Sequence, residues 1–184
     1  MGKTYDRLDD KLVKFIKAQK MYFVGSAPLQ GDGHVNLSPK GYDSFVILDD
    51  KTVAYLDIGG SGIETHAHIL ENGRVTLMFC AFEGKANILR LYGKGEVYDF
   101  DHPEFADYVK LFPDFGKVRA VIKINLTRIQ DSCGWGVPFY EFKGERDQLK
   151  RSENHRTYDE WVEHRYNTNS HSIDGLPGLT RPAK

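Results

Sequence analysis

Arg74-Val75-Thr76-Leu77-Met78-Phe79-Cys80-Ala81-Phe82 is the most apolar run of the chain, and the turn Glu83-Gly84-Lys85 leads from it into a second segment, 86–98. Runs rich in β-branched and aromatic residues, separated by a glycine-containing turn, are typical of β-strands. Glycines at positions 93 and 95 predict a bend or bulge in the second strand. These segments therefore predict a central strand and a long, bent strand of an antiparallel sheet.

Further strands and a few short helices are predicted on both sides of this pair. The alternation of apolar and polar residues predicts strands at 21–27, 34–38, 45–48, 52–57 and 118–126. Helical spacing predicts helices at 6–20, 63–71, 102–111 and 158–166, the second of them ended by Asn72-Gly73. Because strands and helices do not alternate regularly, the pattern favours an antiparallel barrel with helical decoration over a βαβ fold.

Composition limits the classes of protein to which the chain can belong. The 25 Lys and Arg residues nearly balance the 26 Asp and Glu residues, for a net charge of −1 among 184 residues. This balance argues against a nucleic-acid partner or an anionic membrane surface. No stretch approaches the ~20 apolar residues of a membrane span, and the start of the chain lacks an apolar signal core. With only two cysteines, the expected location is the cytoplasm.

Two polar turns are candidate anion or cofactor contacts. Ser38-Pro39-Lys40-Gly41 places a hydroxyl, an ammonium and a glycine amide at the end of a predicted strand. Gly59-Gly60-Ser61-Gly62 precedes a predicted helix and can present backbone N–H groups to a phosphate. The first turn equally suits an ordinary strand end, and the second a flexible connector.

Histidine and cysteine give no clear catalytic or metal signature. His66 and His68 are two residues apart, so a helix directs them to different faces and a shared metal is not expected. Cys80 lies in the apolar run and is predicted to be a buried small residue. Cys133 lies in a glycine-rich loop without an adjacent base, which argues against a nucleophile. We therefore predict no metal site and assign no catalytic residue.

The segment Ser132-Cys133-Gly134-Trp135-Gly136-Val137-Pro138 is the most distinctive of the chain. A Trp between two glycines can serve as a stacking platform for a flat ligand. It can equally plug one end of a barrel, and the composition does not separate these two interpretations.

The ordered set of these segments resembles the FMN-binding split-barrel family, also called the pyridoxamine 5′-phosphate oxidase-like family. The resemblance covers nearly the whole chain and depends on the order of the motifs more than on any one of them. It is carried by the segments 34–41, 53–57, 74–79, 88–97, 132–138 and 172–179.

The resemblance implies a six-stranded antiparallel split β-barrel, mainly β with small helices, which forms a homodimer with FMN in clefts between the subunits. Lys40 is implied to lie near the polar edge of the flavin ring, Thr65 and Arg90 to face the phosphate, and Trp135 to approach from the partner subunit. The full set of implied cofactor-binding residues is Asn36, Ser38, Pro39, Lys40, Tyr55, Leu56, Asp57, Gly62, Thr65, Arg90, Trp135 and Gly136.

The chain departs from better-known oxidases of this family at two places. Glu64 and Thr65 stand where those oxidases carry an Arg-Lys pair that binds the FMN phosphate, and a Glu there repels a phosphate. Arg90 is the candidate for the compensating cation. The segment 144–149 matches only in part the Arg and His set that grips the substrate phosphate, so we do not expect vitamin B6 phosphate as substrate.

The sequence thus predicts an FMN-dependent oxidoreductase of unknown small-molecule substrate or electron donor, in which the flavin carries the chemistry. A non-catalytic flavin- or haem-binding module, or a haem-degrading relative, is the alternative. Residues 1–151 form the predicted barrel domain. Residues 152–184 form a C-terminal helix and an extended tail, which is predicted to lie on the partner subunit near the cofactor cleft.

Overall fold

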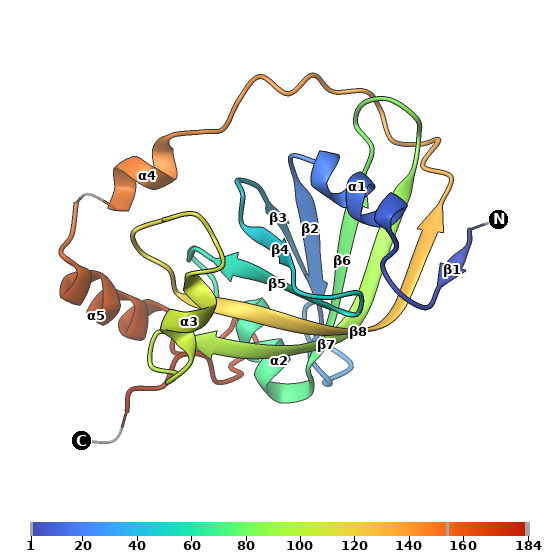
Figure 1. Cartoon of the computed structure of the whole chain (residues 1–184). Coiled ribbons are helices and arrows are strands. Elements are labelled where there is room, and N and C mark those ends of the chain that lie inside the picture. Colours follow the sequence, from blue (N-terminus) through green and yellow to red (C-terminus); the bar gives the residue numbers. More distant parts are fainter. Residues whose placement is uncertain (1, 154, 183–184) are drawn as a thin grey trace.

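The computed structural model of the chain describes residues 2–153 and 155–182 (Figure 1). Its strands are β1 (Thr4–Tyr5), β2 (Tyr22–Ser26), β3 (Asn36–Lys40), β4 (Phe45–Ile47), β5 (Thr52–Asp57), β6 (Arg74–Cys80), β7 (Ile88–Asp99) and β8 (Ala120–Ser132). Its helices are α1 (Asp10–Ala18), α2 (Glu64–Asn72), α3 (Phe105–Val109), α4 (Gln148–Glu153) and α5 (Tyr158–Thr168). Among the described residues, no helix has both the length and the apolar character needed to cross a membrane.

All strands join one antiparallel sheet in the order β3-β2-β6-β7-β8-β5-β4, and β1 pairs with β8. The long strands β7 and β8 carry the sheet around the barrel (Figure 1). At the described edges of the barrel lie β3 and β4, and the edge position lets β3 contain Pro39, which has no N–H to donate. The predicted split barrel is therefore confirmed, and the described residues form eight strands where the family resemblance implies six. The sequence pattern predicts each of these strands except the two-residue β1.

The bend predicted in the long strand is present. The register between β7 and β8 shifts between Tyr92 and Gly93. A Cβ at Gly93 would lie 2.5 Å from Ile124 Cγ2 and 2.6 Å from the carbonyl oxygen of Asn125. Glycine at this position therefore lets the two strands approach closely where the sheet curves.

The helices follow local signals in the sequence. Asp9 caps α1 by accepting a hydrogen bond from the Leu12 N–H, so the helix begins later than residue 6. Gly73 ends α2 in the left-handed conformation, with φ of 70°, at the predicted position. Thr157 and Glu160 form a capping box that begins α5. Helix α3 covers only 105–109 of the predicted 102–111, and α4 was not predicted.

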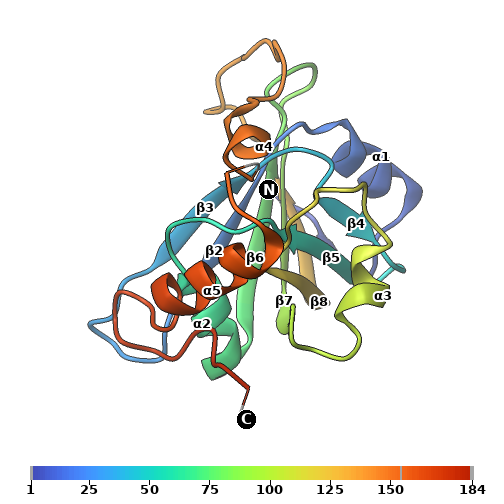
Figure 2. The same ribbon diagram turned by 90° about the vertical axis from the view of Figure 1, so that its left-hand side faces the viewer.

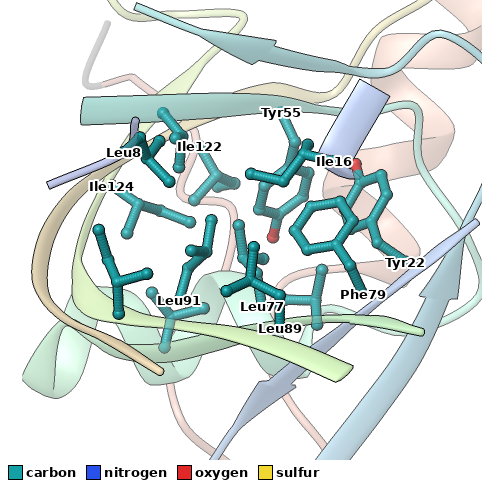
Figure 3. Packing of buried hydrophobic residues seen from close by; sticks show 14 of the residues in the cluster. Leu8, Ile16, Tyr22, Tyr55, Leu77, Phe79, Leu89, Leu91, Ile122 and Ile124 are labelled. Atoms are coloured by element: carbon teal, nitrogen blue, oxygen red, sulfur yellow. The ribbon is translucent and has the colours of Figure 1, made fainter. Parts of the chain in front are cut away.

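The main core fills the inside of the barrel (Figure 3). Inward-facing residues of β5, β6, β7 and β8 meet Ile16 of α1 and the stacked rings of Tyr22 and Phe79, whose centroids lie 5.4 Å apart. A second cluster, which includes Leu56 and Val121, packs on the other face of β5 and β8. A small third cluster of Ile63, Tyr166 and Leu179 fixes the C-terminal segment beside α2 (Figure 2).

Candidate functional site

A cavity of about 730 Å³ opens beside β3, the end of β5, the loop of residues 59–62 and the start of α2. These elements gather on the same side of the barrel as α5 (Figure 2). The volume lies within the range of small-molecule and cofactor sites. The cavity is lined by His34, Val35, Asn36, Ser38, Pro39, Lys40, Tyr55, Asp57, Gly59, Gly60, Ser61, Gly62, Ile63, Glu64, Thr65, Arg119, Thr168, His171, Ser172 and Ile173.

Most of the residues predicted to bind a cofactor line this one cavity. They are Asn36, Ser38, Pro39, Lys40, Tyr55, Asp57, Gly62 and Thr65. The alternation of strand side chains explains the rest of the β5 set. The Tyr55 side chain points into the barrel core and Asp57, on the same face of β5, reaches the cavity wall, while Leu56 faces the second core cluster. Both polar turns singled out in the sequence, 38–41 and 59–62, contribute residues to the cavity wall.

The other predicted residues lie away from the cavity of their own chain. Leu89 and Leu91 point into the barrel core, so Arg90 lies on the outer face of β7, where its guanidinium donates to Ser132 Oγ at 3.1 Å. Trp135 and Gly136 lie in the loop after β8, and 85% of Trp135 is exposed. Trp135 therefore does not plug the barrel within one chain.

An ion-pair cluster forms one wall of the cavity. Arg119 Nε and Nη2 donate to Asp57 Oδ2 at 3.0 and 2.8 Å, and both side chains are buried. Asp57 Oδ1 lies 3.9 Å from Lys40 Nζ. Burial opposes ionisation of Asp57, but Arg119 and Lys40 outweigh it and hold the pKa of this carboxyl well below its ordinary value. Asp57 is therefore an anion at physiological pH.

Arg119 was not identified from the sequence. The alternation in 118–126 placed it opposite the apolar residues, on the expected solvent side. In the structure it is 5% exposed, because the C-terminal segment covers that side. An arginine between the apolar residues Val118 and Ala120 was the available signal, but the sequence did not identify Asp57 as its partner.

A network of hydrogen bonds joins β3 to α2 at the cavity. Asn36 Nδ2 donates to Thr65 Oγ1 at 2.8 Å and to Ser38 Oγ at 3.1 Å. The first turn of α2 adds backbone N–H groups, which have no acceptor within the helix. Ile63, at the N-cap, provides no side-chain hydrogen bond to them. This end of the cavity therefore offers donors to an acceptor-rich ligand.

Two histidines of α2 are buried behind this network. His68 Nδ1 is hydrogen-bonded to Ser26 Oγ at 2.9 Å. Neither ring nitrogen of His66 has a hydrogen-bond partner among the described residues. Burial lowers the pKa of His66 to about 4, so its ring is neutral at physiological pH. The described residues hold no group of three or more His, Cys, Asp and Glu side chains placed to bind a metal ion.

The two cysteines lie in different environments. Cys80 is buried as predicted, and its burial raises the pKa of the thiol. Cys133 is exposed in the loop after β8. Neither residue lines the cavity.

The C-terminal segment packs on its own chain and completes the cavity. Arg165 Nη1 donates to the Gly60 carbonyl at 2.7 Å, and Asn169 Oδ1 accepts from Arg119 at 2.9 Å. Asp174 Oδ1 lies 2.6 Å from His34 Nδ1 at the cavity rim. The tail thus lies beside the cleft of its own subunit, and its predicted contact with a second subunit stays a prediction.

Comparison with known proteins identifies relatives of this chain. A family model described as pyridoxamine 5′-phosphate oxidase matches residues 8–133. The pyridoxamine 5′-phosphate oxidase family protein ustO of Aspergillus flavus is 40% identical over 192 residues, which cover 95% of this chain and 77% of ustO.

Two solved structures of HupZ from Group A Streptococcus have a similar fold. A single-residue variant of HupZ is 23% identical with a TM-score of 0.54, over 67% of this chain and 98% of HupZ. The second HupZ structure is 24% identical with a TM-score of 0.52, over 66% of this chain and 91% of HupZ. At these identities the similarity concerns the fold alone. The family model ends before the C-terminal segment that closes the cavity.

Proposed function

This chain belongs to the pyridoxamine 5′-phosphate oxidase family, and from that premise we propose that it is an FMN-dependent oxidoreductase acting on a small molecule. The observation that carries the proposal is the cavity itself. It gathers Lys40, Thr65 and the first turn of α2, the places that the family resemblance assigns to the flavin, in a volume of about 730 Å³.

The chemistry of the donors fits a flavin. The polar edge of the flavin ring carries carbonyl oxygens and ring nitrogens, and Ser38 and Lys40 offer O–H and N–H donors along β3, while the side-chain N–H groups of Asn36 are directed to Ser38 and Thr65. Gly60 leaves room for a bound group, because a Cβ there would meet no atom within 4 Å. At the other end, the Thr65 hydroxyl and the amides of the first turn of α2 suit a phosphate.

Glu64 is the one unfavourable residue for the phosphate. It lines the cavity, and its carboxylate lies against Gly62, where an added Cβ would fall 2.1 Å from Oε2. The obstruction is the end of a flexible side chain, so Glu64 can turn aside for the phosphate at an electrostatic cost. The donor set as a whole therefore accommodates FMN, with a phosphate site weaker than an Arg-Lys pair provides.

A bound flavin supplies hydride or electron transfer through its ring nitrogen. Lys40 would hold the polar edge of the ring, and its ammonium would favour negative charge there. Ser38 would help to hold the ring through its hydroxyl, and Asn36 would fix Ser38 through their bond of 3.1 Å. The C-terminal residues His171, Ser172 and Ile173 complete the cavity wall.

We further propose that the protein is a homodimer with its cofactor sites at the subunit interface. Arg90 and Trp135, which the resemblance assigns to the cofactor, lie outside the cavity of their own chain. Leu37 on edge strand β3 is 62% exposed and Trp135 is 85% exposed. A second copy packed on this side of the barrel covers the apolar surface and brings Arg90 and Trp135 toward the neighbouring cavity.

Turnover separates an oxidoreductase from a passive flavin carrier. The protein loaded with FMN is mixed anaerobically with NADH or NADPH, and bleaching of the flavin band is followed before oxygen is readmitted. We expect reduction and then reoxidation over repeated cycles. Bound FMN that neither donor reduces points to the binding module, and a haem titration then tests the haem-binding alternative.

A further inference from the structure

The cavity wall contains two cations and only one anion within a buried cluster. The side chains of Asp57 and Arg119 are 6% and 5% exposed, and that of Lys40 is 24% exposed. Glu64 also lines the cavity, but no ion pair joins it to Lys40 or Arg119 within the described part of the chain. The cluster therefore carries one net positive charge beside the cavity.

Arg119 and Lys40 contact the Asp57 carboxylate differently, because only Arg119 forms hydrogen bonds with it. Asp57 Oδ2 accepts two hydrogen bonds from Arg119, at 2.8 and 3.0 Å. Lys40 Nζ is 3.9 Å from Asp57 Oδ1, which is too far for a hydrogen bond. Because Arg119 holds Asp57, the Lys40 ammonium keeps its donors for the cavity.

Arg119, directly before β8, is also held by groups from two other parts of the chain. Nη1 donates to the Gly62 carbonyl at 2.8 Å and to Asn169 Oδ1 at 2.9 Å. Asn169 is fully buried, and its own N–H donates to the Arg165 carbonyl at 2.8 Å. The C-terminal segment therefore shares with Asp57 and the loop before α2 in placing the Arg119 guanidinium.

We propose that Arg119 is a positioning residue for Lys40: held by Asn169 and the Gly62 carbonyl, it engages Asp57 so that the Lys40 ammonium, 3.9 Å from this carboxylate, keeps its hydrogen-bond donors for the cavity. This inference rests on the proposed FMN function for the identity of the ligand. It gives the C-terminal segment, beyond the part of the chain that the family model matches, a part in orienting Arg119 at the cofactor site.

Charge-changing variants are expected to act in opposite directions. In Arg119→Met, Asp57 turns to Lys40, the net charge of the cluster falls to zero, and affinity for FMN falls on the order of tenfold. In Asp57→Asn, an acceptor for Arg119 remains, the net charge rises, and FMN binds at least as tightly as to the wild type. The double variant Asp57→Asn/Arg119→Met restores one net positive charge and brings affinity back to within about threefold of wild type.

A role in packing alone predicts a different pattern, in which all three variants lose affinity together. The midpoint potential of bound FMN gives a second readout, since it is expected to fall in Arg119→Met and to recover in the double variant. Asn169→Ala, which frees Arg119 without removing its charge, is expected to weaken FMN binding in the same direction. Asn167→Ala, an exposed residue of α5, is the matched control and leaves binding unchanged.

A flavin-free readout keeps this inference separate from the proposed function. Acetylation of Lys40 by acetic anhydride in the apoprotein is followed by peptide mass spectrometry, with exposed Lys51 as the internal reference. Relative to Lys51, Lys40 is expected to react several-fold more slowly in Arg119→Met and faster in Asp57→Asn. If these rates change as expected but wild-type protein binds no FMN, the flavin function fails and the positioning role stands. If folded variants leave both acetylation and FMN affinity unchanged, the positioning role is overturned.

Discussion

Glu64 is the residue that sets this chain apart from oxidases that carry an Arg-Lys pair at the phosphate position. Its carboxylate lines the cavity in the first turn of α2. A carboxylate there repels a phosphate dianion, while the helix N-terminus and Thr65 attract it. Affinity for FMN is thus the difference between these opposing effects.

Replacing Glu64 by Gln tests this balance. Glu64→Gln removes the repulsion, so we expect FMN to bind about five- to tenfold more tightly, equivalent to ~1 kcal/mol. Riboflavin lacks the phosphate and is expected to bind Glu64→Gln and wild type equally. Fluorescence titration measures both, with Glu71→Gln in the last turn of α2 as the control. Equal gains for FMN and riboflavin would contradict a phosphate-specific effect.

The Asp57–Arg119 pair has a second consequence, for stability. Asp57→Ala leaves the Arg119 guanidinium buried without its carboxylate. Breaking a buried pair by removing one partner costs about 3–5 kcal/mol. Urea denaturation followed by circular dichroism is expected to show a loss of this size. Asp147→Ala, which breaks an exposed ion pair with Arg151, is the control and changes stability little. Equal effects of the two substitutions would contradict the burial argument.

At the scale of elements, the C-terminal segment is held at the cavity rim by His34 and Asp174. The Asp174 carboxylate accepts from the His34 backbone N–H at 2.8 Å and contacts its ring at 2.6 Å. The hydrogen bond to Asp174 raises the pKa of His34, and Asp32 nearby acts in the same direction. The pKa of Asp174 is lowered by its hydrogen bonds with His34, and His68 adds to this.

This pair predicts a pH dependence with a definite sign. Folding raises the pKa of His34. Its contribution to the stability of the folded state is therefore full below the unfolded pKa of about 6.5 and is lost as pH rises through the folded pKa. Folding lowers the pKa of Asp174. Its contribution to the stability of the folded state is therefore present above the unfolded pKa of about 3.9 and is lost as pH falls through the folded pKa. The pair is therefore strongest between these two unfolded values.

Imidazole titration by NMR measures the His34 effect directly. We expect His34 to titrate at higher pH in wild type than in Asp174→Asn, while Asp32→Asn lowers it less. At pH values above the titration of His34, we expect the amides of residues 170–176 to be less protected from hydrogen exchange than at pH 6. Protection here is the exchange rate relative to the intrinsic rate at the same pH. A His34 titration that Asp174→Asn leaves unchanged would contradict this pairing.

The sequence predicted those elements whose apolar residues form a regular pattern, and it missed those without such a pattern. The interior strands β5, β6 and β7 have strong apolar patterns and were predicted within a few residues. Strand β1 is two residues long and has no periodicity to read. The tail contacts depend on single polar groups such as Asn169 and Asp174, which leave no pattern in a sequence. For the same reason Arg119 was missed although its partner Asp57 was predicted.

At the scale of the whole molecule, the proposed dimer accounts for apolar surface that one chain leaves exposed. Leu37→Glu places a charge on edge strand β3, where the wild-type side chain is 62% exposed. We expect this variant to fold and to sediment as a monomer, and to lose FMN affinity because its cavities lack Arg90 and Trp135 from a partner. Leu111→Glu, at a side chain 48% exposed after α3, is the matched control and remains dimeric. A wild-type chain that sediments as a monomer at all concentrations would contradict the proposed interface.

The central claim, that the cavity beside β3 and α2 holds FMN, is tested most directly by titrating the purified wild-type chain with FMN. We expect the protein to quench FMN fluorescence until one FMN is bound per chain, to show a bound-flavin visible spectrum and to melt at a higher temperature when loaded. A colourless protein that changes neither FMN fluorescence nor its own melting temperature over the titration would contradict the claim.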